Sequence, residues 1–275
     1  MKNISSLIFT AFIVSGINGQ NCTDLFISEY VEGSFNNKAI ELYNPTNEVI
    51  DLSKYSLSRW SNGSTTPLNT ILSGTIEAND AFVIGLDKRD PNGEGYEAPL
   101  WNGWYVFTDS ITGLLDSVYT PEDDLMGRVD LFICPNYEDG TMYFNGNDAV
   151  TLETAEGDII DVIGKIGEDP GEAWGDENDA YWTKDQTLIR KASVTGGFVY
   201  DPTQAYSFDP TLEWDSLPRN TFTELGQHTC NCPDDMSISE FESVINLYPN
   251  PNKSGLLNIE STSPIQEINI YNLIG

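Results

Sequence analysis

Apolar and polar residues alternate along residues 24–57 at the two-residue spacing of a β-strand. Such alternation is typical of a half-buried antiparallel sheet rather than of a helix. Turn-forming residues interrupt it at 33–37 and at 44–47. The stretch therefore predicts three short strands joined by turns, with these residues in the core: Leu25, Ile27, Ile40, Leu42, Leu52 and Leu57.

Short apolar segments bounded by turn residues continue along most of the chain. They predict strands within residues 70–76, 81–84, 129–134, 144–152 and 157–164, around Leu188, and a last strand near Phe222. Residues 87–143 follow the pattern least, so we expect an insertion there with its own structure. Within it, Pro121 and the acidic residues after it predict the start of a short helix that ends near Arg128.

The apolar strands carry a family resemblance. Ile27-Ser28-Glu29, Ile40-Glu41-Leu42-Tyr43-Asn44 and Asp51-Leu52-Ser53 resemble the opening of a lamin-tail domain, and Asn145-Gly146-Asn147-Asp148 resembles its later part. This is the immunoglobulin-like module of nuclear lamins, which also occurs in secreted bacterial proteins. The resemblance covers residues 22–232 apart from the insertion. It implies an all-β, immunoglobulin-like two-sheet sandwich that binds or displays rather than catalyses.

The two ends of the sequence predict export. Lys2, an apolar run over 4–14 and small residues up to Gly19 are typical of a secretory signal peptide over residues 1–19. No later run is long and apolar enough to span a bilayer. We therefore expect a secreted or outer-surface protein without a membrane span.

The C-terminal part resembles a second family. A polar linker over residues 233–244 precedes residues 245–275, which contain Tyr248-Pro249-Asn250-Pro251 and Ile270-Tyr271-Asn272. These motifs are similar to the sorting domain that Bacteroidetes-type bacteria use with the type nine secretion machinery, the partner that this resemblance implies. The domain is incomplete at Gly275, so we expect a fragment.

Charge narrows the range of partners. The chain has 43 acidic and 13 basic residues, a formal net charge of −30. A surface of this charge repels phosphate backbones and anionic lipids. We therefore expect no nucleic-acid partner, and an extracellular protein or glycan as the ligand.

Four cysteines are disulfide candidates: Cys22, Cys134, Cys230 and Cys232. An even number in an exported chain favours disulfides, with three connectivities open. We expect one bridge between the start and the end of the domain, from Cys22 to Cys230 or Cys232. The alternative is a metal site at Cys230, Cys232 and His228, whose spacing is short for structural zinc.

Catalytic patterns are absent from the sequence. His228 is the only histidine, no Gly-x-Ser-x-Gly elbow accompanies it, and Thr195-Gly196-Gly197 lacks the lysine of a phosphate loop. We therefore predict no catalytic, cofactor-binding or metal-binding residues and no enzyme activity. The alternative is a secreted metal-dependent hydrolase, a nuclease or phosphoesterase, or an accessory domain of one.

Two further segments are candidates for binding. The acidic loop over residues 168–179 has oxygen ligands that suit calcium, although its spacing does not match an EF-hand; the alternative is a solvated loop anchored by Trp174. Trp101, Trp104 and Tyr105 are either an exposed aromatic platform or part of the core, and core packing is the preferred interpretation.

Overall fold

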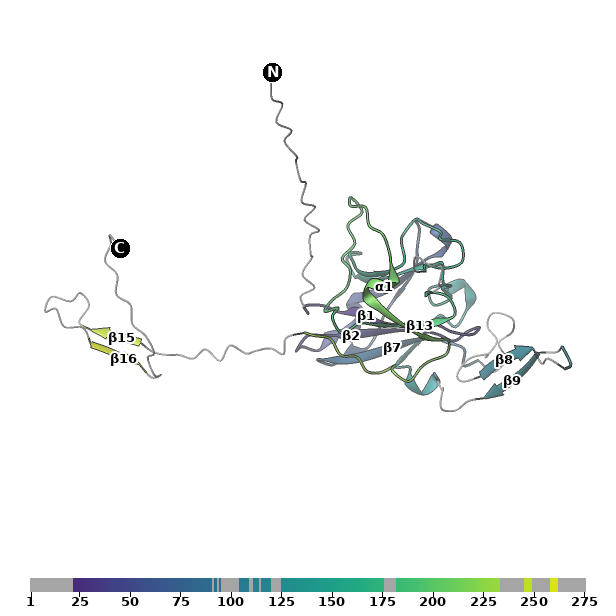
Figure 1. The fold of residues 1–275 in the computed structure, drawn as a ribbon, viewed down its shortest axis with the longest axis horizontal. Helices are drawn as coiled ribbons and strands as arrows, with labels where there is room; N and C mark the ends of the chain where they lie inside the picture. Colours follow the sequence, from purple (N-terminus) through teal and green to yellow (C-terminus); the bar gives the residue numbers. More distant parts are fainter. Residues whose placement is uncertain are drawn as a thin grey trace, which may run out of the picture. The chain divides into compact units, whose positions relative to one another are not determined.

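The computed structural model describes residues 22–90, 92, 94, 104–108, 111–113, 115–119, 125–175, 182–232, 245–248 and 258–261. The chain divides into two compact units, Met1–Cys232 and Pro233–Gly275. Figure 1 shows strands β1, β2, β7 and β13 in the first unit and strands β15 and β16 in the second. The first unit therefore holds the whole of the predicted sandwich.

Six strands form the larger sheet, in the order β10-β7-β2-β1-β13-β14. β10 pairs with β7 in parallel, and all the other neighbours are antiparallel. The strands are β1 (Phe26–Glu32), β2 (Lys38–Asn44), β7 (Asp80–Leu86), β10 (Leu131–Ile133), β13 (Gln186–Arg190) and β14 (Trp214–Pro218).

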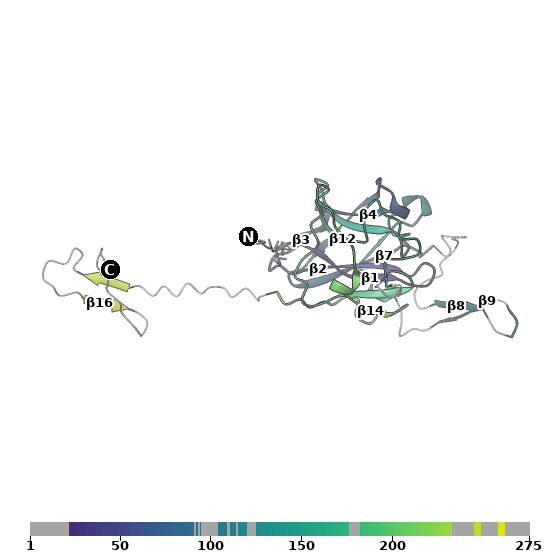
Figure 2. The ribbon, with the colours of Figure 1, turned by 45° about the horizontal axis from the view of Figure 1, so that its top comes forward.

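Four antiparallel strands form the smaller sheet, in the order β12-β11-β4-β5. They are β4 (Tyr55–Trp60), β5 (Leu68–Ile71), β11 (Ala149–Thr154) and β12 (Ile159–Ile163). Figure 2 shows β4 and β12 in a layer above β1, β2, β7 and β14. The predicted all-β, immunoglobulin-like sandwich is confirmed.

Shorter elements connect these strands. β3 (Ile50–Asp51) pairs with β6 (Thr75–Ile76), and β8 (Trp104–Thr108) pairs with β9 (Leu115–Tyr119). The helical turns are η1 (Leu52–Lys54), η2 (Ser61–Gly63), η5 (Met126–Arg128), η6 (Tyr137–Asp139) and α1 (Pro210–Glu213). In the second unit, β15 (Ile245–Tyr248) pairs with β16 (Asn258–Ser261).

Apolar side chains from both sheets fill the space between them. The cluster includes Phe144, Val150, Leu188 and Trp214, each almost fully buried. Removing a large apolar side chain from water stabilises a fold by roughly 1.5–3 kcal/mol. All six core residues predicted from the first strands lie in this cluster: Leu25, Ile27, Ile40, Leu42, Leu52 and Leu57.

The outer face of the six-stranded sheet is also buried. The alternation in the sequence predicted a half-buried sheet, with only one face in the core. Every residue of β1 and β2 is buried. Val31 and Val83 on that face pack against Leu125, Phe222 and Leu225, which reach it from loops far along the chain. Alternation identified the inner face correctly, but it contains no information about segments that cover the outer one.

The last strand of the sandwich lies earlier than predicted. β14 ends at Pro218, and Phe222 lies beyond it in a loop. The N–H of Thr221 donates to the carbonyl of Pro218, and Asn220 has a φ of 63°, so the chain turns here. Asparagine adopts this left-handed conformation more readily than most residues.

Part of the predicted insertion belongs to the sandwich. Leu131–Ile133 forms β10 beside β7, and Met142 lies in the main core. Met126–Arg128 is a single 3-10 turn, while the predicted helix start at Pro121 falls outside the described residues. Trp101 and the side chains of Trp104 and Tyr105 also fall outside them, so the aromatic platform stays a prediction.

A disulfide between Cys22 and Cys232 joins the first and last described residues of the first unit, with their Cα atoms 5.8 Å apart. Backbone hydrogen bonds hold both ends to one neighbouring loop: the N–H of Cys22 donates to Thr195, and that of Asn231 donates to Ala192. The predicted signal peptide lies outside the described residues. Among the residues that are described, no helix is long and apolar enough to cross a membrane.

Candidate functional site

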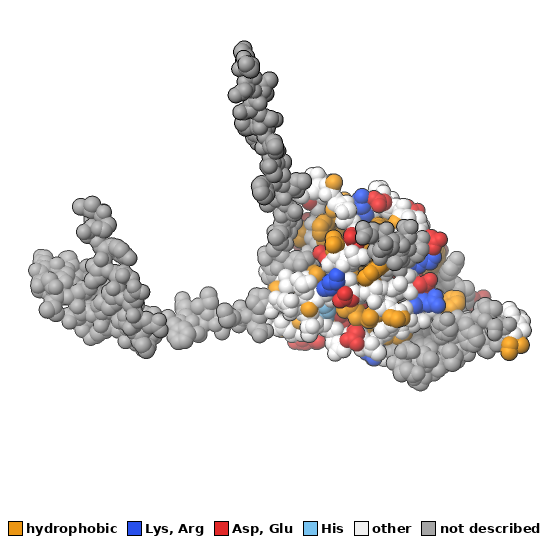
Figure 3. All heavy atoms as spheres, in the orientation of Figure 1, with side chains coloured by type: hydrophobic (Ala, Val, Ile, Leu, Met, Phe, Trp, Pro, Cys, Tyr) orange, Lys and Arg blue, Asp and Glu red, His pale blue; other side chains and the backbone are white. Residues whose placement is uncertain are grey.

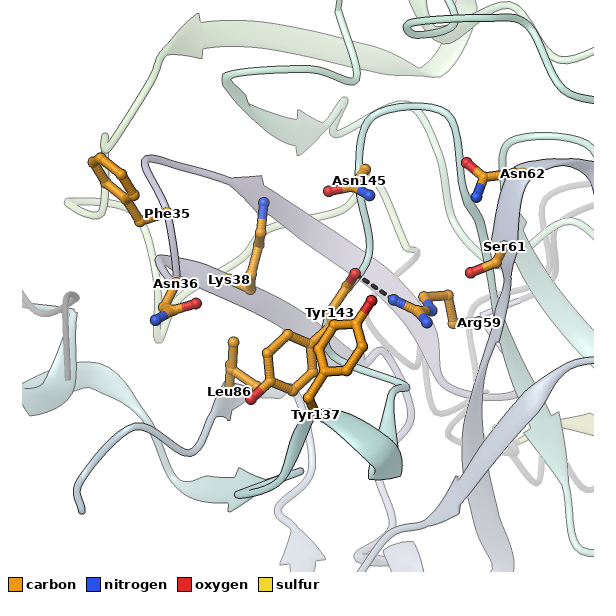
Figure 4. Close-up of a pocket in the computed structure, with 10 residues that line it drawn as sticks. All are labelled: Phe35, Asn36, Lys38, Arg59, Ser61, Asn62, Leu86, Tyr137, Tyr143 and Asn145. Carbon is orange, nitrogen blue, oxygen red and sulfur yellow. Dashed lines mark hydrogen bonds between the residues drawn. The ribbon is translucent and has the colours of Figure 1, made fainter. Parts of the chain in front are cut away.

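A pocket of about 650 Å³ opens where loops from the two sheets meet. Figure 4 shows the side chains around it. Its volume is within the usual range for small-molecule sites. The lining residues are Phe35, Asn36, Lys38, Arg59, Ser61, Asn62, Leu86, Tyr137, Tyr143 and Asn145.

Four separate segments supply these residues. The β1–β2 turn and the start of β2 provide Phe35 to Lys38, and the end of β7 provides Leu86. The end of β4 and the turn η2 provide Arg59 to Asn62, and the chain from η6 to β11 provides Tyr137 to Asn145. The pocket thus exists only when both sheets are assembled.

Asp148 holds two of these segments together. Its buried carboxylate accepts hydrogen bonds from the backbone N–H groups of Asn62, at 2.9 Å, and Asn145, at 3.0 Å. Burial raises the pKa of this carboxyl above its ordinary value, although both hydrogen bonds and nearby Arg59 oppose the shift. Asp148 therefore shapes the pocket from behind its lining.

Arg59 is a buried cation in the pocket lining, with 8% of its surface exposed. Its Nη1 donates to the carbonyl of Tyr143 and lies 3.9 Å from the Asp148 carboxylate. Its Nε is buried without a hydrogen-bond partner. A buried guanidinium donor that lacks a partner costs free energy.

Two lysines increase the positive charge around the pocket. Lys38 lines it and pairs with Glu32, and its Nζ lies 5.8 Å from the centroid of the Phe144 ring. Lys88 is buried beside the pocket, and its Nζ donates to the hydroxyl of Tyr143. None of the lining residues is acidic. On the described face in Figure 3, acidic and basic side chains are intermixed.

Aromatic rings form the floor and rim. Tyr137 and Tyr143 meet edge to face, with centroids 5.0 Å apart. Tyr137 is 47% exposed and Phe35 is 53% exposed. Figure 4 shows the guanidinium of Arg59 beside the two tyrosine rings. A ligand can therefore contact aromatic faces and a cation together.

Cys22 and Cys232 form the bridge between the two ends, whereas Cys134 and Cys230 keep their thiols. The sequence also allowed a second disulfide, between the two remaining cysteines. That disulfide does not form, because Cys134 is buried beside Thr70 in the sandwich. The sulfur atoms of Cys22, Cys230 and Cys232 lie within 4.8 Å of one another, but two of them are bonded together and cannot act as thiolate ligands.

His228 packs between two aromatic rings and also lines a pocket that includes Glu224 and Thr229. Its ring centroid lies 5.6 Å from that of Phe26 and 5.0 Å from that of Tyr43. Burial, with a smaller effect from Arg190, lowers its pKa to about 4. A neutral imidazole packed edge to face with two rings fits a structural role.

The candidate calcium loop is described as far as Gly175 and from Trp182 onward. Its Glu168 pairs with Lys165, and Glu172 pairs with Lys184. Asp169 accepts hydrogen bonds from the N–H of Gly171 and the side chain of Asn147. The described acidic side chains of this loop are therefore engaged within the protein.

The six-stranded and four-stranded sheets pack as an immunoglobulin-like sandwich. Its pocket lies between loops that come from both sheets. The chain matches the Lamin Tail Domain family over residues 18–167 and belongs to that family. The match ends before β13 and β14, which complete the larger sheet beside β1. No curated protein matches the chain.

The family supports a non-catalytic immunoglobulin-like module. The lining of the pocket offers cations, amides and aromatic rings. The sequence did not predict this pocket, because its residues form no motif.

Proposed function

We propose that this protein is a secreted, non-catalytic binding module whose pocket takes an acidic saccharide. The observation that supports the proposal is the lining itself. Lys38 and Arg59 lie beside Tyr137 and Tyr143, with no acidic side chain on the wall, in a chain of net charge −30.

Each part of an acidic sugar has a counterpart in the lining. A carboxylate accepts hydrogen bonds from a guanidinium in favourable planar geometry, and Arg59 supplies a guanidinium to the lining. The apolar face of a sugar ring packs on aromatic side chains such as Tyr137. Sugar hydroxyls and acetamido groups pair with the amides of Asn36, Asn62 and Asn145.

Binding assays with uronic-acid oligosaccharides and neutral oligosaccharides of equal length test the proposal. We expect titration calorimetry to detect only the acidic ligands, with affinity that falls as salt rises. Arg59→Gln removes the charge and should weaken binding at least 10-fold, because a hydrogen bond to a charged group contributes about 1.5–3 kcal/mol. Arg219→Gln, an arginine outside the lining, is the matched control.

A second variant separates binding from folding. Tyr137 is half exposed on the rim, so Tyr137→Ala should weaken binding while the melting temperature falls by only a few degrees, as expected for the loss of its edge-to-face contact with Tyr143. If no acidic saccharide binds the wild type, or if neutral sugars bind equally well, the proposal is wrong.

We also propose that residues 1–19 and 245–275 direct export through the type nine secretion machinery. The support is the charged start and apolar run of the first segment and the Tyr248-Pro249-Asn250-Pro251 motif of the second. A chain ending at Cys232 should stay in the periplasm of a host with this machinery. Release of that shorter chain to the cell surface would contradict the proposal.

A further inference from the structure

The thiol of Cys230 lies against the disulfide that closes the domain. Its sulfur is 2.6 Å from that of Cys232, and Cys232 is bonded to Cys22. All three sulfurs lie within 4.8 Å of one another. Thiol–disulfide exchange requires a thiol at this kind of position, next to one sulfur of an existing bond.

We propose that Cys22, Cys230 and Cys232 form a thiol–disulfide exchange site. The Cys230 thiolate attacks the sulfur of Cys232, a bond forms between these two sulfurs, and the bond from Cys232 to Cys22 breaks. The electron pair of the broken bond goes to the Cys22 sulfur, which takes up a proton and becomes the thiol. The number of disulfides does not change, so the step needs no external oxidant or reductant.

The product offers a new reactive group at the start of the domain. Cys22 is partly exposed, and it sits outside the strands, before β1. Once released, its thiolate can attack a disulfide of another molecule, bonding to one sulfur and releasing the other as a thiolate. The site would thereby attach the domain covalently to a disulfide-containing peptide or small molecule.

The surroundings of Cys230 make the exchange slow rather than instantaneous. Burial raises the pKa of its thiol, although backbone N–H groups of Cys230 and Cys232 oppose the shift. Only a small fraction is thiolate near neutral pH. The two disulfide forms should therefore persist long enough to be trapped separately.

Alkylation of the native full chain tests the proposal. The protein is held at pH 8.5 without reductant, labelled with N-ethylmaleimide, digested at acidic pH and mapped by tandem mass spectrometry. We expect label on Cys230 in some molecules and on Cys22 in others, the latter with a Cys230–Cys232 bond. Label on Cys230 alone, with every Cys22 bonded to Cys232, would overturn the proposal.

Two variants distinguish exchange from simple reduction. Cys230→Ser removes the attacking thiol and should abolish label on Cys22, while Cys134→Ser removes a thiol remote from the site and should leave that label unchanged. If Cys22 is labelled equally in Cys230→Ser, the label comes from reduced protein and the proposal fails. Thermal melts of both variants verify that they fold.

Discussion

Glu29 on β1 and Glu41 on β2 lie directly opposite each other in the larger sheet, and both side chains are buried. Glu41 accepts hydrogen bonds from the hydroxyl of Ser28 and the N–H of Gly226, both at 2.6 Å. Both carboxyl oxygens of Glu29 lack a partner. Burial, together with repulsion from Glu41 and Glu224, raises the pKa of Glu29 to about 9, and burial raises that of Glu41 to about 7.

This pair predicts that the fold loses stability as pH rises. A carboxyl with a raised folded-state pKa binds its proton more tightly in the folded state. The stability that it provides is therefore complete below its ordinary pKa of 4.5 and is lost as pH rises to about 9. Urea unfolding should show a free energy of unfolding at pH 9 lower than at pH 5 by about 3 kcal/mol or more.

Substitution identifies the group responsible. Glu29→Gln cannot ionise, so the loss of stability between pH 5 and pH 9 should be smaller than in the wild type, and the part that comes from Glu41 should remain. Glu156→Gln, at an exposed position, is the control and should leave the pH dependence unchanged. An equal slope in Glu29→Gln would show that Glu29 is not the titrating group.

A buried ion pair on the opposite side of β1 should be necessary for folding. Both side chains of Asp161 and Arg190 are fully buried, and Asp161 also accepts from the N–H of Ile27 at 2.8 Å. Asp161→Asn removes the fully buried one of the two carboxylates that pair with Arg190, since the partly exposed Glu213 remains 2.8 Å away, and should destabilise the fold by about 3 kcal/mol. Chemical denaturation measures this; Asp158→Asn, at an exposed position, should change stability by less than about 0.5 kcal/mol.

The closing disulfide should contribute strongly to stability. Cys22 and Cys232 are 210 residues apart in sequence, and the chain-entropy relation gives about 5 kcal/mol for a loop of this length. Cys22→Ser should lower the free energy of unfolding by close to this amount, whereas Cys230→Ser retains the bridge and should not. Equal stabilities of the two variants in urea would contradict the prediction.

Calcium should leave the protein unchanged. The described carboxylates of the acidic loop already pair with Lys165 and Lys184 or hold backbone and amide N–H groups. We therefore expect the same melting temperature with millimolar calcium and with a chelator. A rise of several degrees in calcium would show that this loop holds the ion.

The inner half of the sandwich could be predicted from the sequence, because strand periodicity directly reports which side chains share a face. Leu25, Ile27 and Ile40 lie in the core for that reason. The cover on the outer face could not be predicted, since Leu125 and Phe222 come from loops without periodicity. The strand at β10 was predicted within residues 129–134, but its parallel pairing with β7 could not be predicted from the sequence.

The pocket could not be predicted from the sequence for a similar reason. Its residues come from four segments, and none of them forms a recognisable motif. Arg59 reads in sequence as an ordinary polar residue of an alternating strand, and only the assembled structure shows that it is buried with an unsatisfied donor. A bridge between the two ends was predictable because an even number of cysteines in a chain expected to be exported favours disulfides, and Cys22 and Cys232 lie at the start and the end of the predicted domain.

The bond between Cys22 and Cys232 also determines how the domain responds to mechanical force. A force applied to the chain before Cys22 and after Cys232 is transmitted through the disulfide between these two residues, whose Cα atoms are 5.8 Å apart. The strands between them carry none of that load. The sandwich, with any bound ligand, would therefore stay folded under a stretching force that would unfold the same domain without the disulfide.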